Sequence, residues 1–390
     1  MDRAVVIDRG AGLARGCRDS AQITSRVVFA DRILMGPGPC NPYPEVVSAF
    51  TRPLLGHLDP DFLELLDQTC ERLRVVFGTQ NELTLPISGT GSAGMEAAFA
   101  NVVRPGAVVV VGVNGLFGER MCEVAARQGA EVVRVEAPWG EPLEPGAILA
   151  AHRAPSVIAL VHAETSTGVR NDLSEIASGK GDALLLADTV TSLGGLPVEI
   201  DGWGVDIAYS GTQKCLGVPP GLAPITVSER ARARLLERPS SWYFDLGLIS
   251  RYVASGAGRT YHHTAPVSMI YALHAGLGVL LEEGLEASWE RHETCGRLLQ
   301  DGLEKLGLEL VAPSTHRLPQ LTTVRVPEAL PPGMGEADIR RALLDRYGIE
   351  IGAGVGPMAG KVWRIGCMGH TARIRNVELL LAALGTLLDR

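Results

Sequence analysis

Residues 182–221 read DALLLADTVTSLGGLPVEIDGWGVDIAYSGTQKCLGVPPG, and two short apolar runs in this stretch lead into polar groups. The first run ends in Asp188, and the second is followed by Gln213 and Lys214. Near-continuous apolar runs of this length are typical of strands in a parallel sheet that is covered on both faces. Ligands bind beyond the carboxyl ends of such strands. The stretch therefore predicts an α/β sheet with a carboxylate and an amine at its ligand-binding edge.

Similar apolar runs recur outward from this stretch, and their spacing, mostly about 20–25 residues, fits strand–helix–strand crossovers. Helical patterns such as AGMEAAFANVV lie between them, with apolar residues three and four positions apart. The predicted strands are LTLPIS (83–88), AVVVVG (107–112), AEVVRV (130–135), SVIALVH (156–162), DALLLAD (182–188), DIAYSG (206–211) and LAPITVS (222–228).

Beyond about residue 265 the chain changes to longer helical patterns with short strands between them. A chain of 390 residues is expected to form two domains. We predict an α/β fold with a mostly parallel central sheet covered by helices in a large domain, and a smaller C-terminal α+β domain. The predicted boundaries are 1–35 for an N-terminal arm, 36–285 for the large domain and 286–390 for the small domain.

Composition and charge argue against several classes of protein. The net charge of −8 argues against nucleic-acid binding, which requires a basic surface. No run reaches the ~18 apolar residues that span a bilayer, and charges interrupt the opening MDRAVVIDRG, so we expect no signal peptide. The seven cysteines form no Cys-x-x-Cys pair, which favours reduced thiols over disulfides or zinc. We expect a cytoplasmic protein without a metal, a membrane or a nucleic acid as partner.

Lysine is scarce in this chain, which narrows the candidates for amine chemistry. The four lysines are Lys180, Lys214, Lys305 and Lys361. Of these, Lys214 is the one that directly follows a predicted core strand. A primary amine in a dry pocket can lose its proton and add to an aldehyde, which an arginine cannot do. Lys214 is therefore the candidate nucleophile.

A glycine-rich turn, Gly89-Thr90-Gly91-Ser92-Ala93-Gly94, follows the first predicted strand and opens a helix. Backbone N–H groups at a helix N-terminus suit a phosphate. A dinucleotide site would also need an acidic residue at the end of the next strand, but Val113-Asn114 stands there. The turn therefore predicts a site for one phosphate monoester, and a tight turn without a ligand is the alternative.

Two charged groups complete the pattern. Asp188, at the tip of a buried strand, would pair well with a pyridinium N–H, and the alternative is a cap of the next turn. Arg364, within the apolar strand KVWRIG, could bind a carboxylate with its two-pronged guanidinium, or form a structural salt bridge. A phosphate turn, a pyridinium partner, an amine and a carboxylate clamp together describe pyridoxal phosphate acting on an amino acid.

The sequence resembles the alanine–glyoxylate and serine–pyruvate aminotransferases, within the class V group of fold type I pyridoxal-phosphate enzymes. The resemblance covers nearly the whole chain, and its most specific part is the Tyr-Ser-Gly-Thr-Gln-Lys motif followed by Pro-Pro-Gly. The matching segments are GPGPCNPYPEV (36–46), SGTGSAGMEAA (88–98), NGLFGER (114–120), AETSTGV (163–169), ADTVTSLGG (187–195), YSGTQKCLGVPPG (209–221), YHHTAP (261–266) and KVWRIGCMGH (361–370).

The resemblance implies a role for each site residue. Lys214 would bind the cofactor covalently and move the proton, and Asp188 would pair with the pyridine nitrogen. Residues implied around the cofactor are Thr90, Gly91, Ser92 and Gln213 at the phosphate, Phe117 and Val190 against the ring, Thr165 near the ring hydroxyl, and Tyr261 and Thr264 reaching the phosphate of the partner in a homodimer. Arg364 and Gly38 would bind the substrate.

Three positions differ from those of related sequences. Phe117 stands where relatives often have Trp, Thr165 where they often have Ser, and Ser92 where some have His. Each keeps a flat apolar face or a hydroxyl group, so the departures leave the cofactor prediction unchanged. The choice of amino acid stays open.

The predicted reaction is transamination between a small 2-amino acid, such as alanine or serine, and glyoxylate or pyruvate. One alternative keeps the cofactor in a cysteine desulfurase-like lyase, which needs a nucleophilic cysteine on a mobile loop; Cys367, in a short turn after a strand, does not fit this. A nicotinamide-dependent oxidoreductase is a further alternative, against which the missing ribose acid speaks. A non-catalytic regulator would need a DNA-binding extension, for which residues 1–30 are too short.

Overall fold

The computed structural model describes residues 30–253 and 258–389. Residues 1–29 lie outside the described residues. The predictions made for them, an arm that contains no signal peptide and is too short for a DNA-binding extension, therefore stay predictions. Residues from Arg32 onward form one compact unit, to which every element named below belongs. The boundary predicted at residue 285 stays a prediction.

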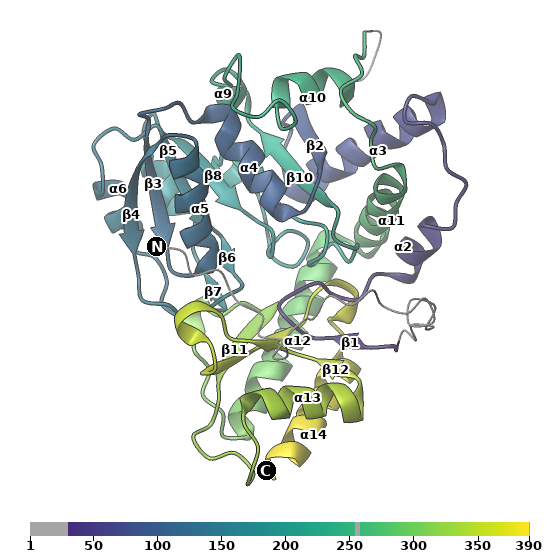
Figure 1. The fold of residues 1–390 in the computed structure, drawn as a ribbon, viewed down its shortest axis with the longest axis vertical. Helices are drawn as coiled ribbons and strands as arrows, with labels where there is room; N and C mark the ends of the chain where they lie inside the picture. Colours follow the sequence, from purple (N-terminus) through teal and green to yellow (C-terminus); the bar gives the residue numbers. More distant parts are fainter. Residues whose placement is uncertain (1–29, 254–257, 390) are drawn as a thin grey trace, which may run out of the picture. The chain divides into compact units, whose positions relative to one another are not determined.

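A seven-stranded sheet has the strand order β2-β10-β9-β8-β5-β3-β4 (Figure 1). β10 is antiparallel to its neighbours β2 and β9, and the other adjacent pairs are parallel. All seven predicted strands are present, and the α/β fold class is confirmed. The strands are β2 (Leu83–Ser88), β3 (Val108–Val113), β4 (Glu131–Glu136), β5 (Val157–Val161), β8 (Leu184–Asp188), β9 (Ile207–Tyr209) and β10 (Leu222–Val227).

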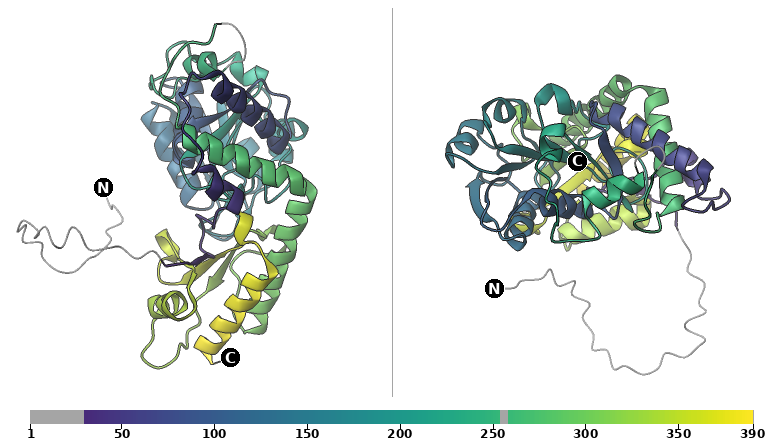
Figure 2. Two further views of the ribbon diagram at one scale, coloured as in Figure 1. Left: turned by 90° about the vertical axis from the view of Figure 1, so that its right-hand side faces the viewer. Right: turned by 90° about the horizontal axis from the view of Figure 1, so that it is seen from above.

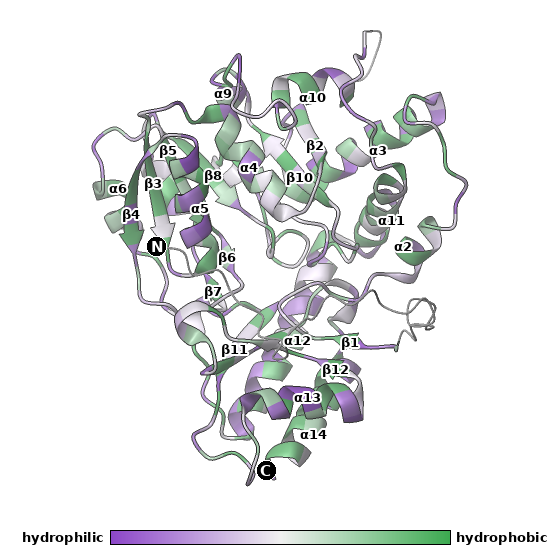
Figure 3. Ribbon diagram, in the orientation of Figure 1, coloured by the Kyte–Doolittle hydropathy of each residue, from purple (hydrophilic) through white to green (hydrophobic). Residues whose placement is uncertain are grey.

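Side chains of the inner strands alternate between two hydrophobic cores, one on each face of the sheet. In β8, Leu184 and Leu186 point to one core, whereas Leu185 and Ala187 point to the other. Both faces are covered, which explains why these strands are almost continuously apolar, as the green of β3, β5 and β8 in Figure 3 illustrates. The covering helices are α4 (Gly91–Val102) and α5 (Leu116–Arg127) on one face, and α3 (Pro60–Phe77), α6 (Pro145–Ala150), α7 (Ser174–Gly179) and α11 (Val267–Glu283) on the other.

Residues beyond α11 build a second core around a small antiparallel sheet in the order β11-β14-β13. Gly284, with φ of +90°, separates α11 from the long helix α12, which lies beside α14 (Figure 2, green and yellow). The predicted strands and helices of this region are present. They are α12 (Leu285–Lys305), β11 (Leu321–Arg325), α13 (Glu336–Tyr347), β13 (Gly352–Ala353), β14 (Val362–Gly366) and α14 (Ile374–Leu388).

The remaining elements are short and connect these two regions. Two of them, β1 and β12, pair in parallel, and β6 and β7 form a hairpin directly after β5. Among the described residues, no helix is both long and apolar enough to cross a membrane. The short elements are β1 (Ile33–Leu34), α2 (Pro44–Ala49), β6 (Ala163–Glu164), β7 (Val169–Arg170), α8 (Ile200–Trp203), α9 (Glu229–Arg232), α10 (Leu246–Val253), β12 (Ile349–Glu350), and the 3-10 helices Ser314–His316, Gly356–Met358 and Gly369–Thr371.

Candidate active site

The predicted functional residues gather beyond the carboxyl ends of the parallel strands. Asp188 is the last residue of β8, and Lys214 lies in the segment after β9. The glycine turn at 89–94 follows β2, and the β6–β7 hairpin follows β5. Since β5, β8 and β9 run parallel, their carboxyl ends share one edge of the sheet, where ligands bind in open α/β folds.

Lys214 is buried, and its surroundings favour the neutral amine. The residue is 7% exposed, and its Nζ donates a hydrogen bond to the carbonyl of Pro37. Burial, together with the positive charge of Arg364, lowers the pKa of Lys214 to about 8. Gly38 lies against the amine: with φ of +105°, a Cβ at this position would come within 2.5 Å of Nζ. An amine held dry with a lowered pKa is suited to attack a carbonyl carbon.

Asp188 accepts two hydrogen bonds in a buried position. Its Oδ1 accepts from the N–H of Val190 at 2.8 Å, and its Oδ2 accepts from the hydroxyl of Tyr209 at 2.8 Å. Burial raises the pKa of Asp188 to about 6, against the effect of these two bonds. The bond from Val190 shows that Asp188 caps the turn after β8, which was the alternative role predicted for it. A carboxylate offers about four acceptor positions, so it can still accept a further N–H.

The glycine turn forms an open helix N-terminus. α4 begins at Gly91, and the side chain of its N-cap residue, Thr90, forms no capping hydrogen bond. The first turn of α4 contains no acidic residue. Thr90 and Ser92 are exposed on either side. A Cβ at Gly91 would lie 3.0 Å from the side chain of Val190, so the turn packs closely against the segment after β8. Uncapped N–H groups with flanking hydroxyls suit an anion.

Gln213 supplies a further polar group beside the glycine turn. Its Oε1 is buried and has no hydrogen-bond partner among the described residues. A Cβ at Gly211 would lie 2.8 Å from Oε1 and 3.4 Å from Gly91. A side-chain amide can turn to present its NH₂ group in the same place. This orphaned position therefore fits an anion bound at the turn.

Phe117 and Arg120, in the first turns of α5, form another wall. The N–H of Phe117 donates to Oε2 of Glu164 at 3.1 Å. The guanidinium of Arg120 lies 5.1 Å from the centre of the Phe117 ring and donates to Oγ of Ser92 at 3.3 Å. Arg120 therefore joins the aromatic wall to the glycine turn.

Arg364 projects from β14 towards the β6–β7 hairpin. Its Nε donates to the carbonyl of Ala353 at 2.8 Å, and its Nη1 donates to the carbonyl of Thr165 at 3.3 Å. Within the described part of the chain it forms no ion pair, so the alternative of a structural salt bridge is not observed. Burial lowers the pKa of Arg364 to about 10, and the negative charge of Glu164 opposes this effect. The remaining N–H groups suit a carboxylate.

Tyr261 and Thr264 contact each other and, among the described residues, form side-chain hydrogen bonds with none of the other predicted site residues. Their hydroxyl groups are 3.3 Å from each other, and Tyr261 is 60% exposed. Nε2 of the neighbouring His263 lies 2.8 Å from Oγ of Ser88, the residue directly before the glycine turn. The prediction that Tyr261 and Thr264 reach the phosphate of a partner subunit stays a prediction.

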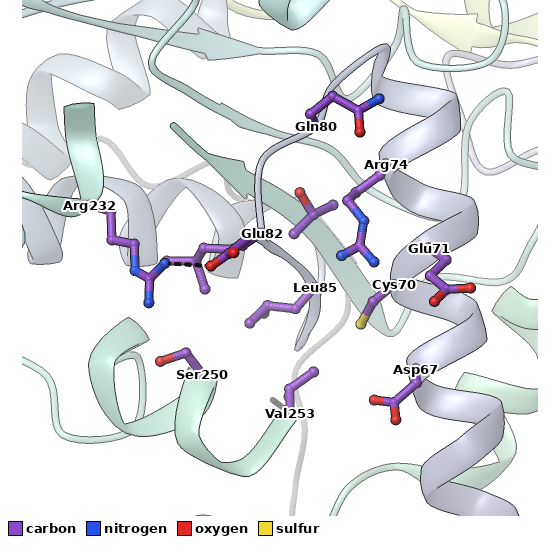
Figure 4. A pocket seen from close by; sticks show the side chains of 12 residues that line it. Asp67, Cys70, Glu71, Arg74, Gln80, Glu82, Leu85, Arg232, Ser250 and Val253 are labelled. Carbon is purple, nitrogen blue, oxygen red and sulfur yellow. Dashed lines mark hydrogen bonds and ion pairs between the residues drawn. The ribbon is translucent and has the colours of Figure 1, made fainter. Parts of the chain in front are cut away.

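A cavity of about 580 Å³ lies near the opposite, amino end of β2 (Figure 4). It is lined by α3, β2 and α10, and the ion pair between Arg232 and Glu82, at 2.9 Å, spans one side of it. None of the predicted site residues lines this cavity, so it is separate from the candidate active site.

Sequence reasoning assigned no role to Tyr209, Glu164, Arg120 and His263. Tyr209 and Glu164 do lie in segments that carry the resemblance, YSGTQK and AETSTGV, and this position was the available signal. Their contacts join segments that are distant in sequence, and a single sequence does not reveal such pairs.

The comparison with known proteins agrees with this geometry. The sequence model of the family described as Aminotransferase class-V matches residues 43–374. The chain belongs to this family. Class-V aminotransferases similar to it include the alanine–glyoxylate aminotransferase of Drosophila melanogaster, 39% identical over 90% of this chain and 91% of the relative. The (S)-ureidoglycine–glyoxylate transaminase of Bacillus subtilis (strain 168) is 39% identical over 92% and 91%.

A solved class-V structure is also close to this chain. The alanine–glyoxylate aminotransferase of Nostoc sp. has a TM-score of 0.90 and 44% identity, and covers 95% of this chain and 99% of its own. The cysteine desulfurase of Thermococcus onnurineus NA1, 14% identical with a TM-score of 0.73, shares the fold. The predicted aminotransferase activity and fold type are therefore confirmed, and the oxidoreductase and regulator alternatives are set aside.

Proposed function

We propose that this aminotransferase uses pyridoxal 5'-phosphate, attached to Lys214, to move the amino group of a small 2-amino acid to glyoxylate or pyruvate. The observation that carries the proposal is a buried amine and a buried carboxylate at one sheet edge, beside an uncapped helix N-terminus. A guanidinium that forms no ion pair with any described residue reaches this place from β14. The membership of the chain in the class-V aminotransferase family independently implies this cofactor.

The residues present fit pyridoxal phosphate in their chemistry. The open turn and the orphaned Oε1 of Gln213 suit a phosphate monoester. Asp188 has acceptor capacity left for a ring N–H. The residues that would hold the cofactor are Lys214, Asp188, Thr90, Gly91, Ser92, Gln213, Phe117, Thr165 and Val190, with Tyr261 and Thr264 supplied by a partner subunit.

When bound, pyridoxal phosphate supplies an aldehyde that condenses with amines and a ring that takes up electrons released at Cα. Lys214 would hold the cofactor covalently, and its amine would carry the proton taken from the substrate Cα. Asp188 would accept the N–H of the ring nitrogen. Arg364 binds the α-carboxylate and so fixes the orientation of the Cα–H bond. Pro37 and Gly38 keep the lysine amine within a narrow, dry space.

The proposed acceptor and donor rest on the relatives and on the charges near the site. Both curated relatives named above use glyoxylate according to their names, whereas their donors, alanine and ureidoglycine, differ. The carboxylate clamp at Arg364 calls for a 2-amino acid. We therefore propose glyoxylate or pyruvate as acceptor, and alanine, serine or a similar small amino acid as donor.

The proposal includes a homodimer with composite sites in the cytoplasm. Beside the 261–264 segment, Trp242 and Tyr261 are 62% and 60% exposed, and such large exposed aromatic side chains are common at interfaces between subunits. The six described cysteines are free and buried, which agrees with a reducing compartment.

The deciding experiment combines labelling with a substrate screen. Borohydride reduction of the loaded protein followed by peptide mapping should label the peptide that contains Lys214. Lys214→Ala should lose the label and turnover, and the exposed Lys361→Ala, a matched control, should keep both. The loaded parent is then mixed with alanine, serine, aspartate and glutamate. Loss of the visible absorbance should be fastest with alanine or serine. A label on another lysine, or clear preference for dicarboxylates, would contradict the proposal.

A further inference from the structure

A fully buried carboxylate lies behind the candidate site. Glu164, the last residue of β6, is 0% exposed. Its Oε1 accepts from the N–H of Ser166 at 3.0 Å and from the Ser166 hydroxyl at 2.6 Å, and its Oε2 accepts from the N–H of Phe117 at 3.1 Å. Burial raises the pKa of Glu164, whereas these hydrogen bonds favour the charged form. Burying a carboxylate costs free energy unless the group is fully hydrogen bonded, so we expect Glu164 to have a specific role here.

Glu164 and Ser166 together satisfy the first N–H groups of α5. The helix starts after Gly115, which has no side chain to cap it. The hydroxyl of Ser166 accepts from the N–H of Leu116 at 2.9 Å, and Glu164 accepts from Phe117. A Cβ at Gly115 would clash with the Glu164 carboxyl carbon, so the helix and the carboxylate are in close contact. A carboxylate at a helix N-terminus is favourable, and this one fixes the turn that carries Phe117.

The segment that contains Glu164 also contacts Arg364. Thr165, the residue after Glu164, accepts the hydrogen bond from Nη1 of Arg364 at 3.3 Å. The charge of Glu164 also opposes the effect of burial on the pKa of Arg364. One short segment therefore contacts both the aromatic wall and the guanidinium.

We propose that Glu164 is a positioning residue that ties the first turn of α5, with Phe117, to the 165–166 turn that holds Arg364. It sets the cofactor wall and the carboxylate clamp relative to each other without touching either ligand. This inference rests on the roles proposed above for Phe117 and Arg364.

The test uses Glu164→Gln, which keeps the side-chain volume and one acceptor oxygen but turns the other oxygen into a donor. That donor must face an N–H of Phe117 or Ser166. A hydrogen bond to a charged group contributes enough that its loss should weaken the linked function at least about tenfold. We expect the affinity of the cofactor-free chain for pyridoxal phosphate, measured by absorbance titration, to fall by this factor. The KM for alanine should rise by a similar factor.

A matched control separates positioning from stability. Asp206 is also a buried carboxylate that accepts a backbone N–H, from Leu185 at 2.8 Å, but it lies at the amino end of β9. Asp206→Asn should lower the Tm and leave the cofactor affinity and the KM unchanged. If Glu164→Gln lowers the Tm and changes neither constant, the positioning role is refuted.

A second variant keeps the inference testable if Glu164→Gln does not fold. Ser166→Ala retains the carboxylate and removes one of its donors and the acceptor for Leu116. It should weaken both constants several-fold, and unchanged constants would overturn the inference. Failure of the proposed function itself would show in the parent protein, which would then not bind pyridoxal phosphate at Lys214.

Discussion

The hydroxyl of Tyr209 offers a sharp test of how the site controls Asp188. Tyr209 is fully buried, and its hydroxyl donates to Oδ2 of Asp188 at 2.8 Å. This bond favours the charged carboxylate and so holds the pKa of Asp188 down, while burial raises that pKa to about 6. Tyr209→Phe removes the bond and leaves the ring in place.

The expected size follows from the strength of that bond. A hydrogen bond to a charged group contributes about 1.5–3 kcal/mol, and one pKa unit corresponds to about 1.36 kcal/mol. The pKa of Asp188 should therefore rise by about one to two units in Tyr209→Phe. Half or more of Asp188 in the cofactor-free site would then be protonated near pH 7, and a neutral carboxyl group stabilises a protonated ring nitrogen much less than a carboxylate does.

The assay is kcat/KM for alanine with glyoxylate, measured from pH 5 to pH 9. The fall in activity at acidic pH should begin about one to two pH units higher in Tyr209→Phe than in the parent. Tyr252→Phe is the control, because Tyr252 is equally buried and donates at 2.8 Å to the carbonyl of His57, away from Asp188. An acidic limb that stays in place in Tyr209→Phe would refute the reasoning.

Three further predictions concern the substrate, the lysine and the dimer. Arg364→Lys keeps the charge but loses two-pronged binding, so the KM for alanine should rise at least about tenfold; an unchanged KM would rule out the clamp. Gly38→Ala places a methyl group within 2.5 Å of Nζ of Lys214 at a φ of +105°, so cofactor absorbance and Tm should both fall; a normal spectrum would contradict the close contact. Mixing inactive Lys214→Ala with inactive Thr264→Ala should restore part of the activity through hybrid dimers, and scattering that shows a fully active monomer would exclude composite sites.

The sheet could be predicted because its strands are buried on both faces. Residues such as those of β8 serve two cores in alternation, so the sequence shows an uninterrupted apolar run that ends where the chain reaches the ligand edge. Asp188 and Lys214 stand out because the first ends such an apolar run and the second follows shortly after another. The fold class and the position of the site followed from this pattern.

The supporting contacts could not be predicted in the same way. Glu164 contacts Phe117, and Arg120 contacts Ser92, across separations that local patterns do not encode. Their partners are set by how helices α4 and α5 pack on the sheet. Arg364, the residue proposed to bind the substrate, was visible as a charge in an apolar strand, but its contact with the Thr165 carbonyl required the structure.

The cover of the large sheet has a consequence for synthesis of the chain. The seven strands are complete at Val227, but the core on one face also needs α11, which begins at Val267 and packs with α3 from the start of the chain. At ~5–20 residues per second, a ribosome needs about 2–8 seconds to add the intervening 40 residues. During that interval the nascent protein holds a finished set of strands whose apolar face is covered by α3, α6 and α7 but not yet by α11. A stalled chain with Val227 just outside the ribosome should therefore recruit chaperones that bind hydrophobic segments, and a longer chain with Glu283 outside the ribosome should release them.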